Sequence, residues 1–268
     1  MPLAPARTLG TFKYAMYFNG VNACVAIPLT VYGWQEITVQ EWLHPLHPKA
    51  NSAWTKFNMI GDYWTDYPSV FWATDNRYDY TELDLVFVTR RSVGTRGIYG
   101  FSIYAYRNSW VNTSWRFSLS DRTLVGYVNN SRVYTASIPS TEKTILEWNP
   151  DTATHPSRYK QFVLGANVYG GEHMKVMQYQ ILIYTRGLSD SEIAWNFNYP
   201  ERPVRNGLYV WLQADPAYIK DIDNDGVLEW LDLSGNNNRG KIYGAQLVQL
   251  VKTPARVLMP ARVLSPVR

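Results

Sequence analysis

Between residues 14 and 186 the sequence alternates short runs of β-branched and aromatic residues with turn-forming pieces such as Asn-Gly, Asn-Asn and Gly-Gly, and helical periodicity is almost absent. Such runs favour strands, because branched and aromatic side chains pack well on a pleated surface, whereas Gly and Asn accept the backbone angles of tight turns. Many short strands at this spacing predict an all-β sandwich or barrel. We expect strands over 14–18, 83–88, 100–106, 115–119, 123–128, 161–164 and 176–184.

One short helix is also expected. Ser189 can accept a hydrogen bond from the first turn while Glu192 reaches back to the Ser189 amide, and Leu188 and Ile193 stand where a hydrophobic staple would close. This pattern predicts a helix over 190–197, which ends before the following proline.

The composition is that of a globular protein. Of 268 residues, 46% are hydrophobic and 18% charged, the opposite of the balance that disorder requires. The single cysteine, Cys24, excludes an intramolecular disulfide and a cysteine-based zinc cluster. The sequence contains no run of about 18 apolar residues, so it predicts no membrane-spanning helix. The first eleven residues contain two prolines and no apolar core, so we expect no signal peptide there.

The excess of basic residues lies at the C-terminal end. The chain has 26 basic and 22 acidic residues, and 252–268 holds four basic and no acidic ones. The rest is therefore neutral, which argues against a nucleic-acid-binding face and leaves the basic C-terminal arm as the place where a nucleic acid could bind.

Several motifs resemble those of laminin-G-like and concanavalin A-like jelly rolls. An aromatic-Asn-Gly turn precedes a short strand that ends in Ile-Pro, and Gly126 begins a hairpin in which Asn130 replaces the usual glycine; asparagine also tolerates a positive φ. The motifs are 17–22, 25–28, 37–45, 126–130, 162–166 and 183–193, of which the last is the most specific. The resemblance covers about residues 13–197 and implies an antiparallel jelly-roll β-sandwich with one short helix and extended terminal arms.

We expect three regions along the chain. Residues 12–200 would form the laminin-G-like sandwich. Residues 201–250 are a strand-rich extension similar to the piece that ordinarily precedes such a core, so it would complete its own sandwich in permuted order or a neighbour's. Residues 251–268 form an extended, basic, Pro-rich arm, because proline every few residues forbids a helix. The arm residues expected to dock on a neighbouring subunit are Val257, Leu258, Arg262, Val263 and Leu264.

The sharpest chemical motif predicts a Ca²⁺ site. Carboxylates at loop positions 1, 3, 5, 9 and 12, a glycine at position 6 and a backbone carbonyl at position 7 match the spacing that wraps oxygen ligands around this ion. No helix pattern flanks the loop, so the site would not be an EF-hand. The alternative is an acidic turn held by Asx hydrogen bonds. The predicted ligands are Asp221, Asp223, Asp225, Val227, Glu229 and Asp232.

An aromatic stretch over 54–80 could serve three purposes. Flat rings beside amides and carboxylates suit sugar binding, a subunit interface or an ordinary core, and the sequence leaves all three open. The residues concerned are Trp54, Trp64, Tyr67, Trp72 and Tyr78.

Enzymatic chemistry has little support. Jelly-roll glucanases carry acids at alternate positions of one strand face, but here Glu82 and Asp84 are followed by Val86, so the set is incomplete. The histidines show no zinc or nucleophile spacing.

Two glycosylation sequons begin at Asn112 and Asn129.

These observations favour a non-enzymatic structural or assembly subunit of an extracellular or virion-surface assembly, with homo-oligomer, filament or capsid neighbours as partners. The alternative is a calcium-dependent carbohydrate-binding or adhesion module with glycans as ligands. A glycoside hydrolase is a third reading. Fold alone cannot separate these functions.

Overall fold

A computed structural model describes residues 12–46, 55–60, 71–76, 84–92, 95–103, 106, 108–147, 149–152, 157, 160–168 and 170–250. Within these ranges, residues 55–59, 71–76, 84–92, 95–99 and 102 are described by their backbone alone.

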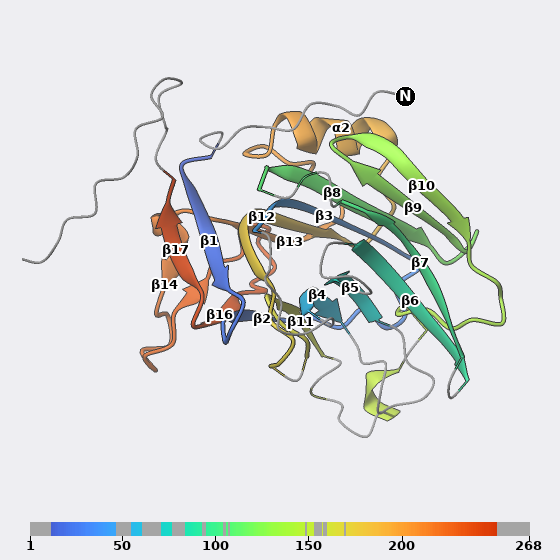
Figure 1. Ribbon diagram of the computed structural model, residues 1–268, viewed down its shortest axis with the longest axis horizontal. Helices are drawn as coiled ribbons and strands as arrows, with labels where there is room; N and C mark the ends of the chain where they lie inside the picture. Colours follow the sequence, from blue (N-terminus) through green and yellow to red (C-terminus); the bar gives the residue numbers. More distant parts are fainter. Residues whose placement is uncertain are drawn as a thin grey trace, which may run out of the picture.

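Two antiparallel sheets form the fold (Figure 1). The eight-stranded sheet has the order β10 (Ser131–Ser137), β9 (Thr123–Val128), β8 (Val111–Ser118), β3 (Glu36–Pro45), β12 (Lys175–Tyr184), β1 (Tyr14–Asn19) and β17 (Gln246–Gln249), with β13 (Leu208–Gln213) also paired to β12. The nine-stranded sheet has the order β14 (Ile219–Lys220), β15 (Glu229–Trp230), β16 (Gly240–Tyr243), β2 (Cys24–Pro28), β11 (Gln161–Leu164), β4 (Thr55–Ile60), β5 (Phe71–Asn76), β6 (Asp84–Ser92) and β7 (Thr95–Ser102). The predicted all-β, antiparallel sandwich is confirmed.

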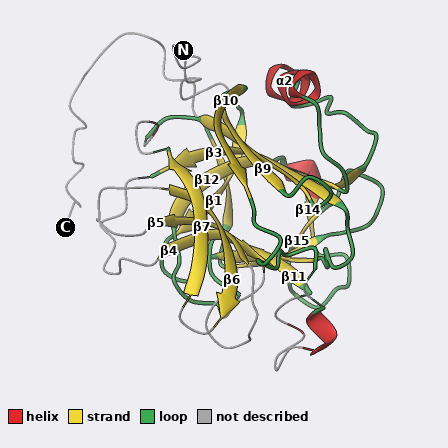
Figure 2. Cartoon of the chain, turned by 90° about the vertical axis from the view of Figure 1, so that its right-hand side faces the viewer, coloured by secondary structure: helices red, strands yellow, loops and turns green. Residues whose placement is uncertain are grey.

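The strand β3 is buried on both faces, which explains its nearly continuous burial from Ile37 to Pro45. Alternate residues such as Val39 join the core between the sheets, whereas Trp42 stacks on Phe197 at the end of the helix α2 (Asp190–Asn198), with ring centroids 5.2 Å apart. Figure 2 shows α2 on one side of the sandwich and β11 and β15 on the other. The sandwich therefore has one outer face covered by the helix and one outer face that lacks it.

The predicted local signals are confirmed. Ser189 caps α2 by accepting from the Glu192 amide at 3.3 Å, and the Glu192 carboxylate accepts from the Ser189 amide at 2.9 Å. Asn129 and Asn130 form the β9–β10 turn with φ of 46° and 70°, so asparagine does replace the hairpin glycine there. Two 3₁₀ turns, Pro150–Thr152 and Pro216–Tyr218, lie outside α2.

The extension over 201–250 pairs with strands of its own chain. β13 pairs with β12, β16 with β2, and β17 with β1, so the extension contributes strands to both sheets. The arm residues Val257, Leu258, Arg262, Val263 and Leu264 lie outside the described residues.

None of the helices in the described part of the chain is long and apolar enough to cross a membrane.

Candidate functional site

A groove lies on the outer face of the nine-stranded sheet, across β16, β2 and β11. Strand alternation creates it: Ile242, Val25 and Ile27 turn into the core, so their neighbours point outward. Lys241 pairs in register with Ala26, which places both side chains on the same face.

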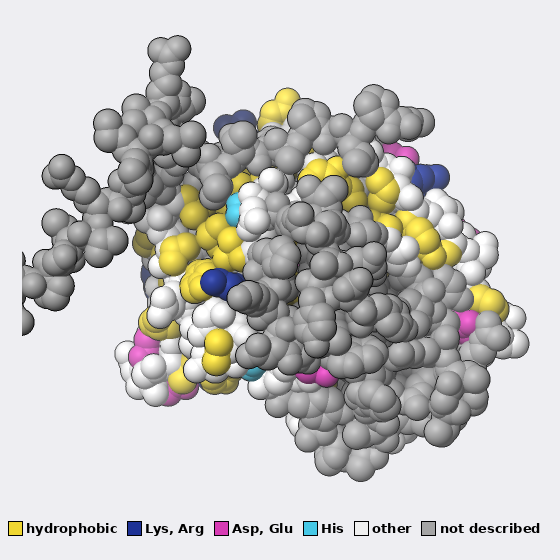
Figure 3. Space-filling model, in the orientation of Figure 1, with side chains coloured by type: hydrophobic (Ala, Val, Ile, Leu, Met, Phe, Trp, Pro, Cys, Tyr) yellow, Lys and Arg dark blue, Asp and Glu magenta, His cyan; other side chains and the backbone are white. Residues whose placement is uncertain are grey.

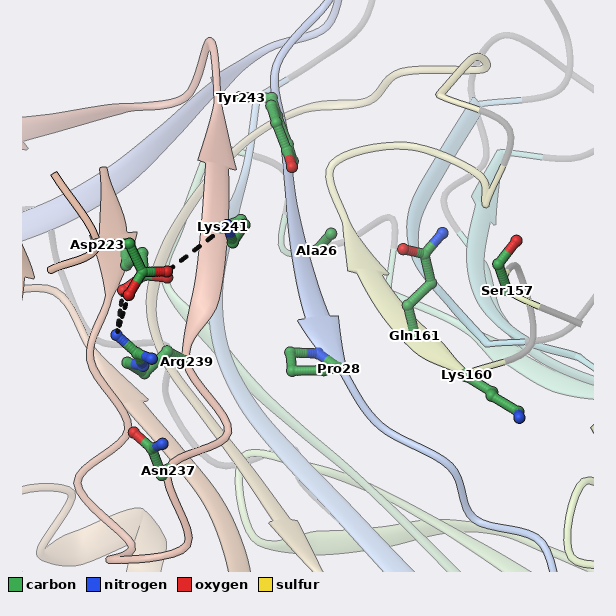
Figure 4. Close-up of a pocket in the computed structure, with 11 residues that line it drawn as sticks. Ala26, Pro28, Ser157, Lys160, Gln161, Asp223, Asn237, Arg239, Lys241 and Tyr243 are labelled. Atoms are coloured by element: carbon green, nitrogen blue, oxygen red, sulfur yellow. Dashed lines mark hydrogen bonds and ion pairs between the residues drawn. The ribbon is translucent and has the colours of Figure 1, made fainter. Parts of the chain in front are cut away.

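The groove has a volume of about 320 Å³, within the lower range of small-ligand sites, about 300–1,000 Å³. Its lining residues are Ala26, Pro28, Ser157, Lys160, Gln161, Asp223, Glu229, Asn237, Arg239, Lys241 and Tyr243. In Figure 4 the labelled side chains extend across the three strands, from Asp223 on one side to Gln161 and Lys160 on the other.

Small apolar residues and polar side chains have separate places in the groove. Ala26 and Pro28 come from the central strand β2 and provide its apolar middle. Lys241 and Tyr243 come from β16 on one side, and Gln161 comes from β11 on the other. Tyr243 is 46% exposed, so an aromatic face is available to a ligand.

Ion pairs hold the basic side chains at the β16 side of the groove. Arg239 Nη1 donates to Glu229 Oε2 at 2.6 Å and lies 3.6 Å from Asp223 Oδ1. Lys241 Nζ lies 3.3 Å from Asp225 Oδ2 and 3.9 Å from Asp223 Oδ2. Because these charges compensate one another, the groove offers many hydrogen-bonding groups without a strong net charge.

The same contacts shift the pKa values of Asp225 and Lys241. The Val227 amide and then Lys241 donate to Asp225, and these hydrogen bonds lower the pKa of its carboxyl. The hydrogen bond and charge of Asp225 in turn raise the pKa of Lys241. Both groups are therefore held in their charged forms.

The loop after β14 has the predicted shape, with Gly226 at a φ of 81°. Its carboxylates, however, have protein partners. Asp221 accepts from the amides of Asp225 and Gly226 at 3.2 and 3.0 Å. Asp232 lies further into the fold and accepts from the amides of Trp211, Ser234 and Asn238, each at 2.9 Å.

The predicted ligand set is thus not assembled as one cluster. Among the described residues, no group of three or more His, Cys, Asp or Glu side chains is arranged to hold a metal ion. The reason is that backbone amides and basic side chains already occupy the oxygens of Asp232, Glu229 and Asp225. Ca²⁺ binding stays a prediction, and it requires these carboxylates to exchange their present partners.

The predicted aromatic site is not part of this groove as described. Trp54, Trp64, Tyr67 and Tyr78 lie outside the described residues, and Trp72 is described only through the backbone of β5. Glu82 also lies outside them, and Asp84 is known only as the first residue of β6.

Both sequon asparagines are buried, each with 1% of its surface exposed. Asn112 Nδ2 donates to the Glu41 carbonyl at 3.0 Å, and Asn129 Oδ1 accepts from the Asn112 amide at 2.9 Å. A glycan on either side chain would require these buried contacts to break.

Sequence reasoning identified Asp223 and Glu229 but missed the other groove residues that the structure places beside them. No sequence motif assigned a binding role to Ala26, Arg239, Lys241 or Tyr243. Alternation in β16 could have placed Lys241 and Tyr243 on one face, but nothing local indicates that β16 pairs with β2.

No protein-family model matches this sequence, and no curated protein does so. Solved structures do match. A candidate carbohydrate-binding protein from Bacteroides ovatus has a TM-score of 0.60 at 12% identity, over 89% of this chain and 60% of that one. The chain therefore spans about 60% of that neighbour's length.

Two further structures are similar at lower scores. The heptameric SAP-like pentraxin of Limulus polyphemus has a TM-score of 0.44 at 11% identity, over 69% of this chain and 82% of that one. Domains LG4-5 of the mouse laminin alpha1 chain have a TM-score of 0.43 at 10% identity, over 71% and 47%. At these identities the similarity concerns the fold alone. The two-sheet architecture and the similarity to the Bacteroides ovatus structure show the antiparallel jelly-roll β-sandwich that the laminin-G-like and concanavalin A-like resemblance implies.

Proposed function

We propose that this protein is a non-enzymatic carbohydrate-binding module whose ligand lies in the groove across β16, β2 and β11. The observation that carries the proposal is the composition of the groove: an apolar floor at Ala26 and Pro28, a half-exposed ring at Tyr243, and convergent donors and acceptors around them.

This composition suits a sugar. A pyranose presents C–H groups on its faces and hydroxyls around its edge, so it needs an aromatic or apolar surface together with several hydrogen-bonding groups. Tyr243 and Ala26 supply the first. The Lys241 ammonium and the Gln161 amide can donate to hydroxyls, and the Asp223 carboxylate can accept from them.

The charge balance favours a neutral sugar over an anionic one. Arg239 and Lys241 are neutralised by Glu229, Asp223 and Asp225. On the other side of the groove, Lys160 Nζ pairs with Asp151 Oδ1 at 2.5 Å. An anionic ligand would have to compete with these carboxylates for the basic side chains. The hydroxyls of a neutral sugar can instead form hydrogen bonds with the remaining lone pairs and protons of the ion pairs.

Two lines of support come from outside the groove. The Bacteroides ovatus neighbour is named for carbohydrate binding, which makes sugars the first ligands to test. Burial also raises the pKa of Cys24, which pairs in register with Tyr243, and a raised pKa disfavours the reactive thiolate beside the groove.

Calorimetric titration with the methyl glycosides of glucose, galactose, mannose and N-acetylglucosamine tests the proposal. At least one should bind in the groove, Tyr243→Ala should weaken that groove binding tenfold or more, and Ala26→Arg should abolish the groove binding by filling the floor. Tyr32→Ala is the matched control, because Tyr32 is 49% exposed but lies outside the groove lining. Equal affinity in Ala26→Arg and the wild type would refute the groove as the site.

A structural or assembly role in an extracellular or virion-surface complex is a second candidate. One observation favours it: β17 pairs with β1 on one side and has no other strand partner within the described residues, and the Pro-rich arm follows it directly. Such an edge can accept an added strand from another subunit. Both roles are compatible, because the β17 edge and the groove belong to different sheets.

A further inference from the structure

The helix α2 carries a second aromatic surface far from the groove. Trp195 and Tyr199 are 48% and 50% exposed, and their ring centroids lie 4.4 Å apart at an interplanar angle of 42°. Trp195 lies in the last turn of α2 and Tyr199 caps its C-terminus, so the two rings meet where the helix ends. Figure 3 shows hydrophobic and basic side chains at the upper outline of the molecule, where α2 lies in Figure 1.

The opposite side of α2 is fixed to the eight-stranded sheet. Asn196 Nδ2 donates to Gln40 Oε1 and to the Tyr184 hydroxyl, both at 3.0 Å, and Asn196 Oδ1 accepts from the Val204 amide at 2.8 Å. Ile193 is fully buried. The helix is therefore a rigid support, and burial of its inner side does not require the two outer rings.

The indole itself is also held in place. Trp195 Nε1 donates to the Arg202 carbonyl at 2.8 Å, and the Arg202 amide donates to the Tyr199 carbonyl at 2.9 Å. Because the indole N–H is satisfied within the chain, the surface that Trp195 offers is the apolar face of its ring. A fixed ring loses little conformational entropy when a ligand binds.

The size of this surface selects the kind of ligand. Two half-exposed rings offer roughly 200 Å² of aromatic surface, whereas a stable protein interface needs about 800 Å² on each partner. Among the described residues next to the pair in sequence, Ser191, Asn198 and Glu201 are exposed and polar. A patch of this size with polar side chains at its border fits one sugar ring.

We propose that Trp195 and Tyr199 form a second sugar-binding platform. The helix covers the outer face of one sheet and the groove lies on the outer face of the other, so the two sites face away from each other. One molecule can then bind two glycan chains and cross-link them, with a gain in avidity that either site alone cannot give. The cross-linking rests on the proposed groove site, whereas the platform does not.

The platform is tested first with the groove closed. The Ala26→Arg protein is labelled with 5-fluorotryptophan, and the Trp195 signal is assigned by its loss in Trp195→Phe. Titration with the four methyl glycosides should shift the Trp195 fluorine signal saturably, and Tyr199→Ser should weaken that binding at least fivefold. An unmoved Trp195 signal with all four sugars would overturn the platform, whatever the groove does.

Cross-linking is tested with soluble dextran, galactomannan and mannan by turbidity. The wild type should cross-link at least one of these polymers, and Trp195→Ser with Tyr199→Ser should lose the turbidity while its groove affinity for methyl glycosides stays within twofold. Tyr32→Ser is the matched control and should cross-link as the wild type does. Cross-linking that survives the double substitution would overturn bivalency, and loss of groove binding in the double variant would show that the two sites are not separate.

Discussion

Arg239 donates to the carboxylate of Glu229 at 2.6 Å on the β16 side of the groove, and Glu229 is only 4% exposed. The pair therefore links β15 to the start of β16 within the extension over 201–250, because Glu229 begins β15 and Arg239 immediately precedes β16. A buried carboxylate without its cation is costly, since neither water nor another charge replaces the lost partner.

Arg239→Met should lower the free energy of unfolding by about 2–3 kcal/mol, because it leaves Glu229 buried and unpaired. Arg239→Met with Glu229→Met should recover most of this loss, since the remaining pair is apolar and similar in size. Urea denaturation of the three proteins measures both effects. Additive losses in the double variant would mean that the ion pair does not account for the destabilisation.

Lys241 makes the Ca²⁺ prediction more specific, because its ammonium group pairs with Asp225 and Asp223 and would compete with Ca²⁺ for their carboxylates. Ca²⁺ should raise the melting temperature by mass action. Lys241→Ala should bind Ca²⁺ more tightly than the wild type, and Asp223→Ala with Asp225→Ala should abolish the rise. If neither Ca²⁺ nor EDTA moves the melting temperature of the wild type or of Lys241→Ala, the loop is a turn held by its hydrogen bonds and ion pairs.

The Arg186–Glu192 pair at the start of α2 should make stability depend on acid pH. Arg186 Nη2 lies 2.5 Å from Glu192 Oε1, and this hydrogen bond is the main cause that lowers the pKa of Glu192 from 4.5 to about 2. A carboxyl with a lowered folded-state pKa stabilises the fold above its unfolded pKa, and the contribution is lost as the pH falls from about 4.5 to 2.

Because the pair is partly exposed, we expect this contribution to be on the order of 1 kcal/mol. Urea denaturation of the wild type and Glu192→Gln should differ at pH 6 and converge near pH 2. Gln keeps the size of the side chain and removes its charge, so it isolates the titration. A difference that stays constant between pH 6 and pH 2 would contradict the assignment.

The elements that could be predicted are those set by local chemistry. The capping residues Ser189 and Glu192 and the Asn129-Asn130 turn act over three or four residues, so the sequence alone identifies them. The strands over 123–128 and 161–164 have the predicted bounds. Their turn-forming neighbours define where they end.

The groove could not be predicted because strand order is a long-range property. Ala26 and Lys241 stand more than 200 positions apart in sequence, and only the pairing of β2 with β16 brings them together. The role of Asp232 was hidden for the same reason: the sequence shows an acid at loop position 12, but not that the Trp211 amide of β13 reaches it. The sequence also left open whether residues 201–250 complete their own sandwich or a neighbour's, because this depends on the pairing of β2 with β16.

Assembly through the C-terminal arm stays a prediction, because its residues lie outside those that the structure describes. Deleting the residues after Lys252 should leave a folded protein that no longer assembles, and light scattering with size-exclusion chromatography measures the change. Replacing Val257, Leu258, Val263 and Leu264 by serine in the full chain is the matched control for chain length. A truncated chain that forms the same oligomer as the full chain would refute the arm's role.

The methyl group of Ala26 offers the most direct measurement of the central claim, because it lies in the floor of the groove between Lys241 and Gln161. We would label alanine methyl groups with ¹³C, assign Ala26 by Ala26→Gly, and titrate the protein with the methyl glycoside that binds most tightly in calorimetry. A saturable shift of the Ala26 signal with the calorimetric affinity is the predicted result. An unmoved Ala26 signal at saturating sugar would place the ligand elsewhere and contradict the assignment of carbohydrate binding to this groove.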